Sequence, residues 1–165
     1  MRALLLAFIL TVAWPMESWA QDKPNFSGTW TLDASKSDTP LAAGRAGGGG
    51  RAGRGGLGAL GGGGNGPVVI TQTDTEIAIG AVTYKLNGSS TPIGGGRGAA
   101  AQAKAAWDGS KLVIEVTRDV QGNTLTTKQV RSLDTTGKEM RVEITVNAPR
   151  GERTVTQVFT KADGA

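Results

Sequence analysis

Acidic side chains offer this sequence its widest choice of chemistry. The 165-residue chain has 14 Asp and Glu but neither His nor Cys, which excludes a thiolate nucleophile, a Ser–His–Asp relay and a zinc site of the usual kind. Two carboxylates could act together as general acid and general base. Most of them, however, fall in turns or at outward positions of alternating segments, where charge is solvated: Asp108, Glu115, Asp119, Asp134, Glu143 and Glu152. The sequence therefore predicts no catalytic residues, and we expect a protein that is not an enzyme.

One cluster of oxygen-bearing side chains could hold a calcium ion. Asp33, Ser35, Ser37 and Asp38 follow one another closely, and calcium takes oxygen ligands. The spacing lacks the EF-hand pattern, and the same residue types close β-turns by hydrogen bonding to the backbone. We favour the turn, and we predict no metal and no cofactor.

The charge of the chain gives no sign of a nucleic-acid partner. Lys and Arg total 18, for a formal net charge of +4, and the surplus is spread along the sequence. Arg45, Arg51 and Arg54 lie among the glycines of residues 44–66, but no aromatic side chain accompanies them to stack on bases. We interpret 44–66 as a flexible, disordered insertion, and the shorter glycine-rich segment 88–98 as a second loop.

The beginning of the chain has the pattern of a secretory signal peptide. A positive start is followed by the apolar run Ala3–Ala13, and Ser18 and Ala20 put small residues before a cleavage site. The apolar run is too short for a membrane span, which needs about 20 residues. We expect residues 1–20 to be removed after Ala20. The mature domain, residues 21–165, would then be periplasmic or secreted in a bacterium, without a membrane span.

Outside the glycine-rich segments, apolar and polar residues alternate in short runs separated by turn residues. The clearest run lies at 139–147, where Met140, Val142, Ile144 and Val146 share one face. The Ala-rich run 100–107 favours a helix by propensity, but the following Asp108-Gly109 joins it to an evident strand, so we predict a strand there too. The predicted strands are 26–33, 68–73, 76–79, 82–87, 100–107, 111–119, 124–134, 139–147 and 152–161.

Short turns between consecutive strands predict an all-β fold. An antiparallel up-and-down meander of this length protects its edges best by closing into a small barrel of about 8–9 strands. The inward residues are mainly aliphatic. Such an interior is either filled by side chains or left with a small apolar cavity, and the pattern leaves both alternatives open.

The first predicted strand carries a resemblance to known proteins. Its G-x-W motif, Gly28 to Trp30, resembles the opening strand of lipocalins and their calycin relatives. Uncharacterised exported lipocalin-like proteins of environmental bacteria resemble the chain over three segments: Phe26–Ser37, Trp107–Ile114 and Arg150–Lys161. The resemblance implies that Gly28 permits a close backbone approach and that Trp30 closes one end of a lipocalin-like barrel. It also implies that Arg153 takes the place of an arginine that lipocalins have late in the barrel.

Two functions follow from this fold. The first is a non-enzymatic, exported protein that binds a small apolar or amphipathic ligand inside the barrel. The second is a structural or protein-interaction module, such as an envelope scaffold or an inhibitor, with a filled barrel. The two differ in interior volume, because binding requires a cavity of about 300 Å³ or more. We expect the binding protein, for which the sequence assigns no ligand-binding residues.

Overall fold

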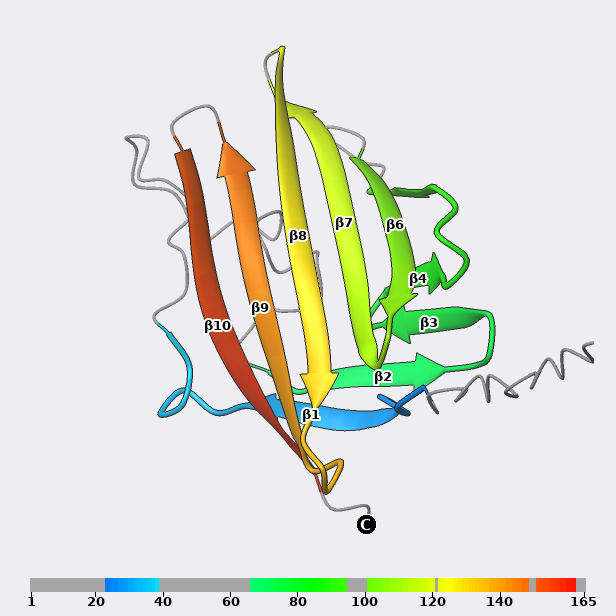
Figure 1. The fold of residues 1–165 in the computed structure, drawn as a ribbon, viewed down its shortest axis with the longest axis vertical. Coiled ribbons are helices and arrows are strands. Elements are labelled where there is room, and N and C mark those ends of the chain that lie inside the picture. Colours follow the sequence, from blue (N-terminus) through cyan, green and yellow to red (C-terminus); the bar gives the residue numbers. More distant parts are fainter. Residues whose placement is uncertain (1–22, 39–65, 95–100, 121, 149–150, 163–165) are drawn as a thin grey trace, which may run out of the picture.

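The computed structural model describes residues 23–38, 66–94, 101–120, 122–148 and 151–162. These residues form ten strands and no helix (Figure 1). The strands are β1 (Gly28–Leu32), β2 (Val68–Gln72), β3 (Glu76–Ile79), β4 (Val82–Lys85), β5 (Thr91–Ile93), β6 (Ala101–Asp108), β7 (Lys111–Val120), β8 (Asn123–Leu133), β9 (Glu139–Ala148) and β10 (Gly151–Lys161). The predicted signal peptide and the glycine-rich insertion, apart from Gly66, lie outside the described residues.

All ten strands belong to one antiparallel sheet, in the order β4-β3-β2-β1-β10-β9-β8-β7-β6-β5. Neighbours in the sheet are consecutive in the chain except where β1 pairs with β10, with Trp30 opposite Lys161. The chain is therefore the predicted meander, with its first and last strands joined. The long strands β6 to β10 run side by side, and β1 to β3 cross them at one end (Figure 1).

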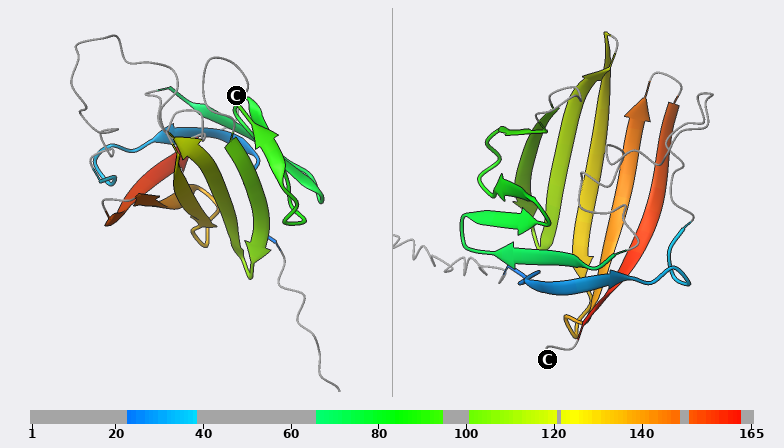
Figure 2. Two further views of the ribbon diagram at one scale, coloured as in Figure 1. Left: turned by 90° about the horizontal axis from the view of Figure 1, so that it is seen from above. Right: turned by 180° about the vertical axis from the view of Figure 1, so that it is seen from behind.

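The two ends of the sheet approach each other. β4 and β5 are its edge strands, and just after β4 the residue Asn87 forms an antiparallel bridge with Ala106 of β6. Beside this bridge the amide of Gly88 donates a hydrogen bond to the carbonyl of Ala105, 2.9 Å away. Seen from above, the sheet curls round on itself (Figure 2). The fold is a nearly closed antiparallel barrel, as the sequence predicts.

A glycine turn decides the conformation of the Ala-rich segment. Asp108 pairs with Lys111 across the β6–β7 hairpin, which leaves two residues in the loop, and Gly109 has φ 59°. Two-residue hairpins need this left-handed conformation, which glycine adopts without steric cost. The hairpin makes 101–108 a strand, with Ala103 and Ala105 buried on its inner face.

The structure adds one strand to the nine that alternation predicts. β5 lies in the segment 88–98, which the glycine content marks as a loop. Ile93 of β5 is buried in the core, but a strand of three residues is too short to show a period of two. Among the described residues, no helix is long and apolar enough to span a membrane.

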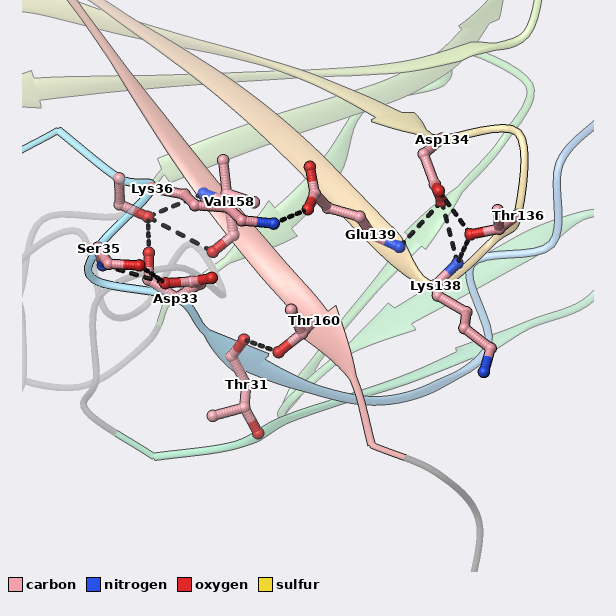
Figure 3. A network of polar contacts seen from close by, with 11 residues as sticks. Thr31, Asp33, Ser35, Lys36, Asp134, Thr136, Lys138, Glu139, Val158 and Thr160 are labelled. Atoms are coloured by element: carbon pink, nitrogen blue, oxygen red, sulfur yellow. Dashed lines mark hydrogen bonds and ion pairs between the residues drawn. The ribbon is translucent and has the colours of Figure 1, made fainter.

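The segment after β1 extends the wall along β10. The amide of Asp33 donates to the carbonyl of Val158 at 2.8 Å, and the amide of Asp38 donates to that of Thr156 at 2.8 Å. The Ser37 hydroxyl accepts a hydrogen bond from the Val158 amide at 2.9 Å. On the outer side, Lys36 pairs with Glu139 of β9 (Figure 3). The outward side chain of Val158, whose amide and carbonyl both bond to this segment, is buried.

The oxygen-rich cluster within this segment forms a turn. The carboxylate of Asp33 accepts hydrogen bonds from the Ser35 hydroxyl at 2.6 Å and from the Ser35 amide at 3.0 Å. The Ser35 hydroxyl bond, above all, holds the pKa of Asp33 below its usual range. The Asp38 carboxylate accepts from the Thr156 amide at 2.7 Å. The two acids thus satisfy backbone and side-chain donors of the turn and of β10.

Candidate functional site: a polar layer inside the barrel

The two residues of the G-x-W motif both contact Lys161, the last residue of the neighbouring strand β10. Trp30 is fully buried, its indole nitrogen donates to the carbonyl of Phe26 at 2.8 Å, and the ammonium of Lys161 lies 5.5 Å from the ring centroid. Gly28 has φ +139°, and a Cβ placed on it would lie 2.5 Å from Cε of Lys161. Because Gly28 has no side chain, the side chain of Lys161 can pass close to its backbone and place its ammonium over the Trp30 ring.

The lipocalin resemblance implies a late arginine at Arg153, and this role stays a prediction. Arg153 is exposed on the first half of β10, whereas the cation that lies over Trp30 belongs to Lys161, eight positions later. Strand geometry puts the two about 26 Å apart. The barrel-closing roles of Gly28 and Trp30 stay a prediction.

Aromatic rings gather around this end of the barrel. The rings of Phe26 and Trp107 stack with their centroids 6.0 Å apart, and the ammonium of Lys23 lies 5.9 Å from the Trp107 ring. The Phe26 amide donates to the side-chain oxygen of Gln72 at 3.0 Å. Because Trp30 also bonds to Phe26, these residues tie the segment before β1 to β2 and β6.

Most of the interior wall is aliphatic, as predicted. The core residues of the long strands include Leu112, Ile114 and Val116 on β7, and Met140, Val142 and Ile144 on β9. They occupy alternate positions, so the other face of each strand is turned to solvent. β6, which pairs with the edge of β7 away from β8, adds small side chains to this wall: Ala101, Ala103 and Ala105.

The strand between β7 and β9 is different. The inward positions of β8 are held by Thr127, Gln129 and Arg131, all of which are buried. Each lies between aliphatic partners: Arg131 pairs with Leu112 on one side and with Val142 on the other. A polar stripe therefore runs down β8, between two strands whose inner faces are aliphatic.

Arg131 is the most unusual member of the stripe, with 0% of its surface exposed. One guanidinium nitrogen donates to the side-chain oxygen of Gln129 at 2.8 Å, and the other terminal nitrogen lies 3.9 Å from the sulfur of Met140. Nε has no hydrogen-bond partner. Among the described residues, no carboxylate forms an ion pair with Arg131.

Burial shifts the ionisation of this group. Loss of solvation lowers the pKa of Arg131 to about 10, and the attraction of the Tyr84 phenol opposes the change. The pKa of the Tyr84 hydroxyl is raised by burial, and the nearby charge of Arg131 partly opposes this shift. At neutral pH Arg131 is still charged. An unpaired charge inside a protein costs free energy that a bound anion would recover.

Alternation alone does not reveal Arg131 in the sequence, because neither face of residues 123–133 is apolar. The register of the hairpin that joins β7 to β8 does show that Arg131 faces inward. With Val120 opposite Asn123, counting back along both strands places Arg131 opposite the inward Leu112. Register fixes the face on which each side chain lies.

Comparison with known proteins identifies the fold. No family model matches the sequence, and a search of curated proteins finds no match. Among solved structures, the chain is similar to the REP1-NXSQ fatty acid transporter, with TM-score 0.51, 13% identity, and coverage of 85% of this chain and 98% of that one. It is also similar to an abundant heat soluble (SAHS) protein from Ramazzottius varieornatus, with TM-score 0.51, 16% identity, and coverage of 85% and 98%. The likeness shows a lipocalin-like barrel.

Proposed function

We propose that this protein is a non-enzymatic binding protein whose barrel takes up a small amphipathic acid. The acid group pairs with Arg131, and the apolar chain lies against the aliphatic side chains of β7 and β9. One observation carries the proposal: Arg131 is completely buried and has no acidic partner among the described residues. In a barrel filled only by its own side chains, an apolar residue at position 131 would make the fold more stable than an unpaired cation does.

Two further observations support this ligand class. The core side chains that flank β8 are aliphatic on both sides, which suits a hydrocarbon chain. One of the similar structures is that of a fatty acid transporter, and fatty acids combine an acid group with such a chain.

The test is a pair of ligands with the same chain, dodecanoic acid and dodecan-1-ol. We expect the acid to bind the wild-type protein and to bind Arg131→Met at least about tenfold more weakly, because a hydrogen bond to a charged group is lost. The alcohol should bind both proteins equally. Arg141→Met is the matched control, since Arg141 is exposed on the outer face of β9 with its Nε 3.4 Å from Glu143. Equal affinity of the acid for wild type and Arg131→Met, or no binding at all, would contradict the proposal.

We also propose that the protein is exported, with cleavage after Ala20. The support is the sequence pattern of residues 1–20. The intact mass of the protein recovered from the periplasm or medium of an exporting bacterium should match a chain that begins at Gln21. A full-length mass in the cytoplasm would contradict export.

A further inference from the structure

Three polar side chains lie in one cross-strand row of the barrel wall, which we call the layer. The registers of successive strand pairs join Trp107 to Leu112, Leu112 to Arg131, Arg131 to Val142, and Val142 to Gln157. This row crosses the sheet from β6 to β10. Leu112 and Val142 are core residues, so the row belongs to the inner face of the wall. Arg131 stands at its centre, with Trp107 and Gln157 two strands away on either side.

Each of these three side chains has a buried polar atom without a hydrogen-bond partner. The atoms are the indole nitrogen of Trp107, Nε of Arg131 and the amide oxygen of Gln157. Gln157 is only 5% exposed. The described residues contain one further atom of this kind, the hydroxyl of Thr91 on β5, so three of the four share a single layer. Unpartnered buried polar atoms are rare in proteins and costly, and their concentration in one row of the wall points to a ligand.

The spacing of the strands sets how far the three side chains must reach to meet at one head group. Neighbouring strands lie about 4.8 Å apart, so Trp107 and Gln157 each start about 10 Å from the backbone at Arg131. All three side chains are long and project to the inside of a curved wall, which brings their ends closer than their backbones.

The kinds of atom define the head group. Arg131 Nε and Trp107 Nε1 are donors, and both need an acceptor. The amide oxygen of Gln157 is an acceptor, and it needs a donor. A carboxylate has two acceptor oxygens and no donor, so it satisfies the first two atoms and leaves Gln157 without a partner.

We propose that the ligand is an acid that carries a hydroxyl or an amide N–H within a few bonds of its carboxylate. This inference rests on the proposed function and adds a second recognition element to it. The carboxylate accepts hydrogen bonds from Arg131 and Trp107, while the hydroxyl or amide of the ligand donates to Gln157. A 3-hydroxy acid or an N-acyl amino acid fits this pattern, whereas a simple fatty acid fits only part of it.

The experiment compares dodecanoic acid with 3-hydroxydodecanoic acid and N-decanoylglycine. Dissociation constants are measured by displacement of a fluorescent fatty acid, for the wild type, Gln157→Leu, Gln157→Met and the outward control Thr154→Val on the same strand. We expect the wild type and Thr154→Val to bind at least one of the donor-bearing acids about tenfold more tightly than dodecanoic acid. In both Gln157 variants the ratio of the two constants should fall to about one. Thermal melts of each variant establish that it is folded.

The outcomes separate this inference from the proposed function. Equal affinities of the wild type for all three acids overturn the second recognition element, while a loss of dodecanoic acid binding in Arg131→Met still supports the acid site. A preference that survives in both Gln157 variants assigns it to another residue and also overturns the inference. If none of the acids binds the wild type, the proposed function fails and the inference fails with it.

Discussion

Replacement of Arg131 by methionine should make the ligand-free protein more stable. Methionine has nearly the length of arginine without its charge, and its neighbours in the wall are Leu112, Val142 and Met140. Burial lowers the pKa of Arg131 to about 10 from an ordinary value of 12.5. At about 1.4 kcal/mol for each pKa unit, the charged group costs roughly 3 kcal/mol in the folded state. Loss of its hydrogen bond to Gln129 offsets about 1–2 kcal/mol of this gain. The expected net stabilisation is about 1–2 kcal/mol.

The assay is urea denaturation of the wild type, Arg131→Met and the outward control Arg141→Met, without ligand and with dodecanoic acid. A ligand at 100 times its dissociation constant stabilises a protein by about 2.7 kcal/mol, and at ten times by about 1.4 kcal/mol, so acid that binds the variant tenfold more weakly should remove most of the stability difference between wild type and Arg131→Met. Because the pKa of Arg131 is lowered in the folded state, its cost is complete below pH 10 and is relieved only above that pH. The stability gain of Arg131→Met should therefore be the same at pH 6 and at pH 8.

A loss of stability in Arg131→Met would refute this reasoning. It would mean that the guanidinium is compensated inside the folded protein and that its place in the layer is structural. A variant that is more stable but still gains full stabilisation from the acid would refute the ligand assignment alone. The two results are distinct, because one is read without ligand and the other only with it.

Three further predictions test the fold. Trp30→Ala should lower the free energy of unfolding in urea by about 3–5 kcal/mol, the range for truncating a large buried aromatic side chain. A loss below about 1 kcal/mol would contradict the role of this ring in closing one end of the barrel. Gly28→Ala should lose about 1–3 kcal/mol because φ is +139° there; Lys161→Ala in the same protein should not restore stability, and full recovery would assign the loss to the side-chain contact instead. Asp134→Asn should lower the melting temperature at pH 6 but not at pH 2. Hydrogen bonds to the Asp134 carboxylate, above all from the Thr136 hydroxyl, lower its pKa to about 2. The carboxylate therefore stabilises the fold above the ordinary carboxyl pKa, and this stabilisation disappears as the pH falls through 2. A difference in melting temperature between the two proteins that persists in full at pH 2 would contradict this.

The parts of the fold that alternation predicts are those whose two faces differ most. β9 has Met140, Val142 and Ile144 in the core and charged residues at Arg141 and Glu143 between them, so both its existence and its orientation follow from the sequence. The Ala-rich β6 needs the turn at Gly109 to distinguish a strand from a helix. β5 has too few residues for any period, and only the barrel around it makes it a strand.

The candidate site escapes sequence analysis for a physical reason. Thr127, Gln129 and Arg131 are polar residues at inward positions, and alternation identifies an inward face only when that face is apolar. Gln157 escapes in the same way, since its inward position on β10 depends on pairing with Val142. Places where a local rule fails in an otherwise consistent sequence are often functional. Here the inward polar residues lie on β8 and β10, the two neighbours of β9 in the sheet.

The placement of opposite charges supports this interpretation of Arg131. Lys36 pairs with Glu139, and Arg141 with Glu143, although both pairs are exposed and such pairs contribute at most about 1 kcal/mol. Arg131, whose buried charge has the most to gain from a carboxylate, has none among the described residues. A cation that lowers the stability of the free protein stabilises it only when an anion arrives. We therefore infer that the anion Arg131 requires is supplied by the ligand.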